Sequence, residues 1–292
     1  MPPSTPIKVP TFLKWAGGKQ QLLRQFSRYF PSKVANYSEP FLGGGATFFY
    51  ILKYKSPSIA KAYDINEDLI NVYSQVKNKV SELKEALDNI EQEHNSSIDP
   101  KSYYYRKRTA FNTRRKTLDM AALFIYLNKT CFNGLYRVNS KGKFNVPFNG
   151  IKNIKLYDDG ITEASELLNK AKVTVESKDF TEIKFDKDDI VYFDPPYWTK
   201  HKKNGFTKYN GNGFDKDMQT KLSEIFKALS TNGHMVILSN SDTSLINTLY
   251  SEATYIKHRI RARRLINCDG KGRNEIEELL ITANINRIQK HL

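Results

Sequence analysis

Two strand-like segments near the N-terminus flank a glycine cluster and a helix, and this layout constrains the fold more than any other feature. Residues 37–41 suit a short strand, and the glycine cluster at 43–45 follows at once. Residues 46–54 have a helical pattern, and residues 59–63 form a second strand-like run that ends at Asp64. This order is typical of a nucleotide-binding unit, so it predicts an α/β fold.

The glycine cluster and Asp64 also indicate a cofactor site. Glycines let the backbone approach a ligand closely, and an acid about 20 residues further on can hold ribose hydroxyls. The cluster matches neither the dinucleotide pattern GxGxxG nor a phosphate-binding loop with its lysine. By itself it is equally compatible with an ordinary loop, and it is the acid after the next strand that favours a cofactor.

Another strand-like segment ends in Asp194-Pro195-Pro196-Tyr197, and this sequence carries the chemistry. Ligands bind at the carboxyl ends of strands in open α/β sheets. The prolines stiffen the turn and remove two backbone donors, so its carbonyl groups can act as acceptors. A carboxylate beside a carbonyl suits an exocyclic –NH2 group, and Tyr197 offers a flat face for stacking. The alternative is a simple turn after a strand, because Asp-Pro often opens turns.

A third motif lies near the N-terminus, where Gly17 and Gly18 precede Lys19 at the start of a helix predicted over residues 19–30. The start of a helix carries partial positive charge, and a lysine there can pair with a carboxylate. Alone, this motif is also what an ordinary helix entry looks like.

Positive charge is concentrated in two blocks of the chain, whose net formal charge is +15. Residues 101–155 contain thirteen Lys or Arg and one acid, and residues 255–275 contain seven against two acids. Because the rest of the chain is close to neutral, the blocks favour a polyanion as partner over a merely solvated surface. Aromatic residues are interleaved with the first block and could stack on exposed bases.

Composition excludes several classes of protein. Two cysteines form no disulfide framework, and with five scattered histidines they give no metal-ligand pattern, so we expect a metal-free protein in a reducing cytosol. The longest apolar run, residues 121–127, is too short to span a membrane, and residues 1–10 have no signal-peptide pattern. We therefore expect a cytoplasmic protein that does not associate with a membrane.

A mainly helical region interrupts the α/β pattern. Residues 66–94 and 101–130 have helical periodicity, and residues 131–150 are rich in Asn and Gly, which indicates an irregular loop. The most basic part of the chain therefore falls in this interruption.

The strand pattern returns toward the C-terminus. We predict strands at residues 173–176, 190–193, 235–238, 255–259 and 278–282, and a helix at residues 217–228. The sequence thus predicts one domain formed by residues 1–65 and 155–292, with a second, mainly helical domain of residues 66–154 inserted into it.

Taken together and in this order, the motifs resemble the Dam-type DNA adenine-N6 methyltransferases, which use S-adenosylmethionine (SAM). In that family a target-recognition region is inserted between the SAM-binding and the catalytic motifs. The matching pieces are LKWAGGK at 13–19, EPFLGGGATFF at 39–49, YDIN at 63–66, NKTCFNGLYRVNSKGKFNVPF at 128–148, DPPY at 194–197, ILSNSD at 237–242 and KGRNEIEELLIT at 271–282. The departures from the family pattern are small. Phe132 stands where the family often has Tyr, and residues 129–131 fall at positions that vary somewhat within the family.

The resemblance implies a Rossmann-like SAM-dependent methyltransferase sheet and assigns roles to individual residues. The family's SAM contacts fall on Trp15, Lys19, Asp64, Phe180 and Asp194, Asp179 would address the cofactor adenine, and Phe41 and Gly43 of the glycine turn are added as candidates. The catalytic loop falls on Asp194, Pro195, Pro196 and Tyr197. The DNA contacts fall on Arg108, Phe132, Asn133, Leu135, Arg137, Asn139 and Pro147.

The resemblance also implies double-stranded DNA as the substrate, with GATC as the target. We expect the basic blocks to hold phosphates and the target adenine to flip out of the stack, with Phe132 filling the vacated space. Tyr197 would stack on the flipped base, and the Asp194 carboxylate and Pro195 carbonyl would accept hydrogen bonds from its N6. Arg137 is expected on the guanine next to the adenine, a phosphate contact or a surface charge being the alternatives.

Three other functions remain open at this stage. The same loop chemistry would serve a methyltransferase acting on cytosine N4 in DNA or on adenine in RNA. A DNA-binding protein without catalysis would have a broken SAM site, yet Lys19, Asp64 and Asp194 are all present. A small-molecule methyltransferase would leave the basic blocks without a purpose. The sequence leaves the oligomeric state open, and a monomer is compatible with it.

Overall fold

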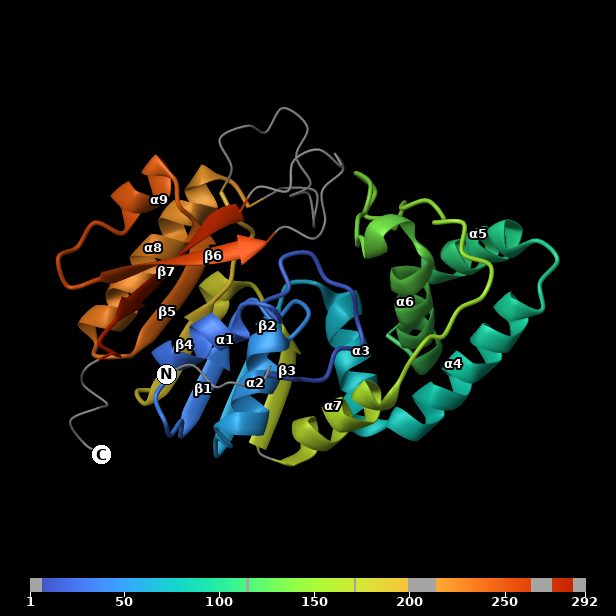
Figure 1. Ribbon diagram of the computed structural model, residues 1–292, viewed down its shortest axis with the longest axis horizontal. Helices are drawn as coiled ribbons and strands as arrows, with labels where there is room; N and C mark the ends of the chain where they lie inside the picture. The colour runs from blue at the N-terminus through green and yellow to red at the C-terminus, as the bar shows by residue number, and fades with distance from the viewer. Residues whose placement is uncertain (1–6, 114–115, 171, 199–213, 264–274, 286–292) are drawn as a thin grey trace.

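A computed structural model of the chain describes residues 7–113, 116–170, 172–198, 214–263 and 275–285. Its central feature is a seven-stranded sheet in the order β3-β2-β1-β4-β5-β7-β6 (Figure 1). The strands are β1 Asn36–Glu39, β2 Ile59–Asp64, β3 Lys172–Ser177, β4 Asp189–Phe193, β5 Val236–Ser241, β6 Ile256–Arg263 and β7 Glu275–Ala283.

The first five strands of the sheet are parallel, and β7 runs antiparallel between β5 and β6. The chain proceeds outward from β1 to β2 and β3 on one side, and from β4 to β5 on the other. The order therefore reverses between β1 and β4. In sheets of this kind, ligands bind outside the carboxyl ends of the strands at such a switch point.

Helices cover both faces of the sheet, as the alternation of buried residues along each strand requires. Tyr192 of β4 packs into a core that includes Phe26, Phe48 and other residues of the first helices. Its neighbour Phe193 packs on the opposite face, in a core shared with Phe226. The helices of the described chain are α1 Leu23–Phe26, α2 Ala46–Tyr54, α3 Glu67–Asn78, α4 Val80–Asn95, α5 Pro100–Phe111, α6 Leu118–Thr130, α7 Asp159–Lys170, α8 Lys216–Thr231 and α9 Ser244–Leu249.

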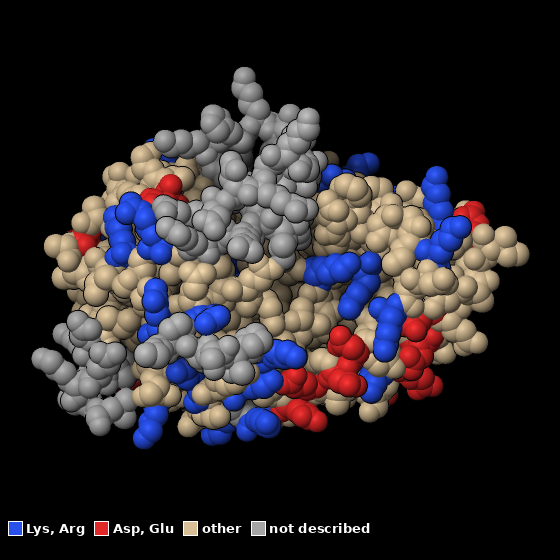
Figure 2. All heavy atoms as spheres, in the orientation of Figure 1, with Lys and Arg blue, Asp and Glu red and all other residues tan. Residues whose placement is uncertain are grey.

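Helices α4, α5 and α6 form a region at the side of the sheet, on the right in Figure 1, and their buried residues belong to the same core as Tyr192. Helix α3 connects this region to the sheet, because it contacts β2 and β3 as well as α6. Buried aromatic rings join the helices, with His94 of α4 hydrogen-bonded to the Tyr126 hydroxyl of α6 at 3.0 Å. Figure 2 shows Lys and Arg side chains over both parts of the molecule, and acidic side chains gathered at the lower edge of the helical part.

Several element boundaries differ from the sequence prediction. The helix expected over residues 19–30 is only the short α1 and a 3-10 turn, because its start has no capping side chain and Pro31 follows. The helix expected over residues 66–94 breaks at Lys79, whose φ of −146° is not helical, and the 101–130 segment divides where Thr117 caps α6. Helices α7 and α9 were not predicted.

Among the described residues, no helix has the length and apolar character needed to cross a bilayer. The cations of the first basic block are mostly exposed, namely Lys101, Arg106, Lys116, Arg137, Lys141, Lys143, Lys152 and Lys155. Of the second block, Lys257 and Arg259 are described, and they pair with Asn247 and Asp242. The side chains of its other cations lie outside the described part of the chain.

Candidate active site

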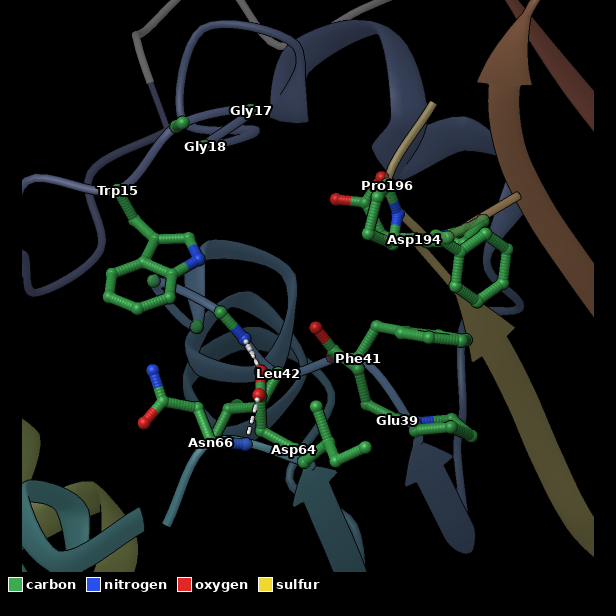
Figure 3. Close-up of a pocket in the computed structure, with 18 of the residues that line it drawn as sticks. Trp15, Gly17, Gly18, Glu39, Phe41, Leu42, Asp64, Asn66, Asp194 and Pro196 are labelled. Atoms are coloured by element: carbon green, nitrogen blue, oxygen red, sulfur yellow. Dashed lines mark hydrogen bonds between the residues drawn. The ribbon is translucent and has the colours of Figure 1, made fainter. Parts of the chain in front are cut away.

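A cavity of about 500 Å³ opens at the carboxyl ends of β1, β2 and β4, next to the switch point of the sheet. Figure 3 shows Trp15 on one side of it and Asp194 with Pro196 on the other, with Asp64 and Asn66 below. The expected cofactor and catalytic residues all line this one cavity: Trp15, Lys19, Phe41, Gly43, Asp64, Asp179, Phe180, Asp194, Pro195, Pro196 and Tyr197.

The glycine turn is shaped by the side chain of Trp15. Gly43 has a φ of +49°, a left-handed conformation that favours glycine. A Cβ atom added at Gly43 or Gly44 would lie 2.9 Å from the Trp15 side chain. Glycine is therefore required at both positions because the Trp15 ring lies so close to the backbone. The glycines and Trp15 all line the cavity.

Asp64 fastens the end of β2 to the glycine turn. Its Oδ2 atom accepts a hydrogen bond from the Gly43 N–H at 3.0 Å, and its Oδ1 atom accepts one from the Asn66 N–H at 2.9 Å (Figure 3). Burial raises the pKa of Asp64, while the two backbone donors lower it. Since each carboxylate oxygen has two lone pairs, Asp64 keeps acceptor capacity for ligand hydroxyls.

Lys19 lies against the carboxylate of Asp194, in the loop expected to be catalytic. Its Nζ atom is 2.8 Å from Asp194 Oδ1 and donates a hydrogen bond to the Gly17 carbonyl, also at 2.8 Å. Burial raises the pKa of Asp194 to about 6, and the Lys19 charge limits the rise. The sequence predicted that this lysine could meet a carboxylate, and the structure identifies the carboxylate as that of Asp194.

Glu39, at the end of β1, is a buried acid that the sequence analysis did not select. Its Oε2 atom accepts a hydrogen bond from the Tyr37 hydroxyl at 2.7 Å, and it lines the cavity. Burial raises its pKa well above the usual range, and nearby Asp194 raises it further. The signal was present in the sequence, because Glu39, Asp64 and Asp194 each end or directly follow a parallel strand.

Two buried amide side chains anchor the loop of residues 194–198 to the elements packed against it. The Gln219 Nε2 atom donates to the Pro196 carbonyl at 3.0 Å, and Gln219 Oε1 accepts from Asn240 Nδ2 at 3.0 Å. Asn240 Oδ1 accepts in turn from the Trp198 N–H at 3.3 Å. Both amides are fully buried, so this chain of hydrogen bonds fixes the loop to α8 and β5.

Tyr197 is held at both its ring and its hydroxyl. The hydroxyl donates a hydrogen bond to Glu278 Oε2 of β7 at 2.7 Å. The Lys19 ammonium lies 4.8 Å from the centre of the ring. Neither Glu278 nor the Gln219–Asn240 pair could be selected from the sequence, because these partners are far from the loop along the chain.

The other end of the cavity is apolar and aromatic. The rings of Phe41, Phe180 and Phe214 lie with centroids 5.3 to 5.6 Å apart. Ile65 also lines the cavity and is 51% exposed, although it is a large apolar residue. Asp179 lies beside Phe180 and caps the following turn through the Thr181 N–H at 2.9 Å. Such a surface suits a flat heterocycle with polar edges.

The predicted DNA contacts at Phe132, Asn133, Leu135 and Pro147 lie on or beside one loop after α6. Phe132 is 48% exposed, and its N–H donates to the Pro147 carbonyl at 2.9 Å. Asn133 is exposed with a φ of +56°, and Leu135 lines the cavity. An exposed aromatic ring on a constrained turn is compatible with insertion into a base stack.

The remaining three predicted DNA contacts differ in the hydrogen bonds that they make within the protein. Arg137 is exposed at the rim of the cavity, and its Nε atom donates to Asn145 Oδ1 at 2.7 Å. Arg108 supports the loop, because its Nη1 atom donates to the Val146 carbonyl at 3.1 Å. Asn139 shapes a turn, since its Oδ1 atom accepts from two backbone N–H groups of that turn.

Lys14 and Trp15, at one side of the cavity, contact α6 and the loop that follows it. Trp15 stacks on Phe124 and on Tyr136, with ring centroids 6.2 and 5.9 Å apart. The Asn128 amide hydrogen-bonds to both backbone groups of Lys14 and also to the Gly134 carbonyl.

Among the described residues, no group of three or more His, Cys, Asp or Glu could hold a metal ion.

A sheet of this order, with its cavity at the switch point, defines a Rossmann-like α/β fold with a ligand site. The model of the D12 class N6 adenine-specific DNA methyltransferases matches residues 15–264. The chain therefore belongs to this family and is a site-specific DNA adenine methyltransferase.

Curated relatives agree with this placement along nearly their whole length. The type II methyltransferase M.MjaIII of Methanocaldococcus jannaschii is 40% identical, over 94% of this chain and 99% of that protein. The type II methyltransferase M1.LlaDCHI of Lactococcus lactis is 38% identical, over 94% and 96%. The DNA adenine methylase of Escherichia coli K12 is 34% identical, over 92% and 93%.

Proposed function

We propose that the protein transfers a methyl group from SAM to N6 of a flipped adenine in double-stranded DNA, at GATC sites. DNA adenine methylation follows from the family, whereas the donor, the duplex form of the DNA and the target sequence are the proposal. The observation that carries it is the Lys19–Asp194 pair beside the Pro195-Pro196 turn, which places a carboxylate and carbonyl acceptors at the edge of a cofactor-sized cavity.

The lining of the cavity fits the chemical groups of SAM. Asp64 offers acceptors for the ribose hydroxyls, and the aromatic end with Phe41, Phe180 and Asp179 suits the adenine ring. Trp15, Gly43 and Lys19 line the part nearer to Asp194 and would hold the methionine portion. A Cβ at Gly43 would fill space beside Trp15, so the cradle depends on glycine. SAM, when bound, supplies an electrophilic methyl group on a positively charged sulfur, and S-adenosylhomocysteine would leave once the S–CH3 bond has been exchanged for the bond to N6. The methylated N6 would become neutral by releasing one proton.

The residues of the catalytic loop orient the amine. Tyr197 stacks on the flipped adenine, while the Asp194 carboxylate and the Pro195 carbonyl accept the two hydrogens of N6. The Pro196 carbonyl accepts a hydrogen bond from Gln219 that holds the loop, and Pro195 is the proposed backbone acceptor for N6. Lys19 favours the ionised form of Asp194, and this carboxylate stabilises the positive charge that develops on the nitrogen.

Residues 66–154 are proposed to form the target-recognition domain, and residues 1–65 and 155–292 the catalytic domain. The exposed cations of the first block hold phosphates, and Phe132 fills the space left by the flipped adenine. Arg137 contacts the guanine next to the adenine, and Asn133, Leu135 and Pro147 lie on the same loop. Arg108 and Asn139 are proposed as further DNA contacts, and their hydrogen bonds to the backbone keep that loop in shape.

The experiment that tests this function maps the methylated base. The purified protein is incubated with SAM carrying a labelled methyl group and with duplex DNA, single-stranded DNA and RNA of the same sequences. We expect labelled N6-methyladenine in GATC of the duplex alone. Label on cytosine, in single strands only or in other sequence contexts would contradict the proposal, and a donor other than SAM would contradict its cofactor.

A further inference from the structure

Residues 137–145 of the loop form a small hairpin that carries Arg137. Val138 and Phe144 pair across it as an antiparallel bridge, and the Asn145 N–H donates to the Arg137 carbonyl at 3.1 Å. Asn139 closes the turn, where its backbone N–H donates to the Lys143 carbonyl at 2.9 Å. Arg137 and Asn145 are therefore opposite one another at the open end of the hairpin, beside the cavity.

Helix α5 and Asn112, the residue that caps its C-terminal end, anchor this hairpin by contacts to its backbone. The Asn112 side chain accepts from the Phe144 N–H at 2.7 Å and donates to the Phe144 carbonyl at 3.0 Å. The Tyr104 hydroxyl and the Arg108 guanidinium both donate to the Val146 carbonyl. The residues before and after Asn145, Phe144 and Val146, are thus both hydrogen-bonded to side chains of this helical segment. The backbone that carries the Asn145 side chain is therefore well fixed.

We propose that Asn145 is a specificity-determining residue, which holds Arg137 Nε so that the two terminal nitrogens present a fork to guanine. The contact that carries this inference is the 2.7 Å hydrogen bond from Arg137 Nε to Asn145 Oδ1. The proposal rests on the proposed function, because it takes the guanine contact of Arg137 as given.

The chemistry of the guanidinium group explains why this contact matters. Guanine presents two acceptors, O6 and N7, in the major groove, and a planar guanidinium can meet both at once. With Nε occupied by Asn145, the terminal nitrogens are the pair that remains for this contact. An exposed arginine loses rotamer freedom when it binds, and a side chain already held in place loses less.

Another role for the Asn145 amide is a hydrogen bond from its Nδ2 atom to a DNA phosphate. The two roles use opposite ends of the amide, so one substitution separates them. Asn145→Asp keeps an acceptor for Arg137 Nε but replaces the donor by a negative charge that a phosphate repels. Asn145→Ala removes both ends.

The test measures methylation rates of the unmodified protein, Arg137→Ala, Asn145→Ala and Asn145→Asp. Each acts on a GATC duplex and on duplexes whose guanine is replaced by adenine or by 7-deazaguanine, which lacks the N7 acceptor. Asn149→Ala is the matched control, an exposed asparagine nearby that contacts the Lys129 carbonyl and not Arg137. Thermal unfolding of every variant separates a loss of fold from a loss of discrimination.

We expect Asn145→Ala to lower the preference for guanine by about tenfold, since a bidentate contact contributes that order of discrimination. Asn145→Asp should keep the preference while binding all duplexes more weakly, and Asn149→Ala should behave as the unmodified protein. An equal loss on all duplexes in Asn145→Ala, or a lost preference in Asn145→Asp, would overturn the role of Asn145. If Arg137→Ala itself keeps the preference for guanine, the guanine contact of the proposed function fails, and this inference fails with it.

Discussion

The Nζ atom of Lys19 lies 2.8 Å from the Oδ1 atom of Asp194, and the two side chains are only 4% and 18% exposed. The pair joins the motif near the N-terminus to the proposed catalytic loop, and more than half of the chain separates the two. Burial raises the pKa of Asp194 to about 6, and Lys19 is the main influence that opposes this rise. The lysine therefore helps to decide whether the acceptor is ionised near neutral pH.

The rate of methyl transfer should fall as the pH decreases through about 6, because the protonated Asp194 accepts hydrogen bonds less well. In Lys19→Gln the opposing charge is gone, so this acidic limb should move to higher pH. Single-turnover rates at saturating SAM and DNA, measured as a function of pH, check the shift. Lys33→Gln, at an exposed lysine, is the control. A lower rate with an unmoved limb would confine Lys19 to cofactor binding.

Asp64→Ala should weaken SAM binding by about 1–3 kcal/mol, the cost of leaving buried partners unsatisfied. It also removes the acceptor of the Gly43 and Asn66 N–H groups, so the melting temperature should fall. Asp64→Asn keeps one acceptor oxygen and should lose less of both. Calorimetric titration with SAM is the measurement, and unchanged affinity in Asp64→Ala would remove this residue from the cofactor site.

The ring of Tyr197 should matter more than its hydroxyl. Tyr197→Ala removes the stacking surface and should cost about 1–3 kcal/mol in binding of the flipped base. Tyr197→Phe keeps the ring but loses the hydrogen bond to Glu278 and the contact of the hydroxyl with Asp194, so it should keep more of the rate than Tyr197→Ala. Fluorescence of 2-aminopurine at the target position reports the flipped state. Equal damage in the two variants would mean that the contact to Glu278, and not the ring, sets the position of the base.

DNA affinity should fall steeply as the salt concentration rises, because each neutralised phosphate releases counterions. Lys141→Ala and Lys143→Ala, both exposed on the hairpin, should weaken binding to all sequences alike. Each lost phosphate contact should reduce the slope of log K against log salt by about 0.9. Lys216→Ala, outside the basic blocks, should leave the slope unchanged. A flat plot for the unmodified protein would mean that these cations do not touch DNA.

The sequence placed the ends of β2, β3 and β4 to within one residue, and with them Asp64 and Asp194, because a strand followed by an acid is a local pattern. The ends of β5 and β6 were predicted three and four residues too early. It also predicted α2 with its observed bounds, Ala46–Tyr54, since the glycine turn marks where the helix begins. Helix α7 was missed although Ile161, Ala164 and Leu168 fall at helical spacing and are buried, so that signal was available.

Other features of the site depend on residues that are far apart along the chain, so no local sequence pattern predicts them. Gln219 donates a hydrogen bond to the Pro196 carbonyl, and Glu278 accepts one from the Tyr197 hydroxyl. Only the tertiary fold brings the two residues of each pair together. The same is true of Trp15, whose stacking on Tyr136 depends on how the inserted helices pack. Arg108, expected at the DNA, bonds to a loop carbonyl, a role that charge alone does not indicate.

The central claim is that the Asp194 carboxylate accepts a hydrogen bond from the target amine, and the rate of a single turnover in Asp194→Ala tests it most directly. Labelled SAM and GATC duplex are mixed with excess protein, and DNA affinity and the melting temperature are measured on the same preparation. We predict no detectable methyl transfer by a folded variant that still binds DNA, because affinity lies mainly in phosphate contacts elsewhere. Substantial transfer by Asp194→Ala would contradict the account.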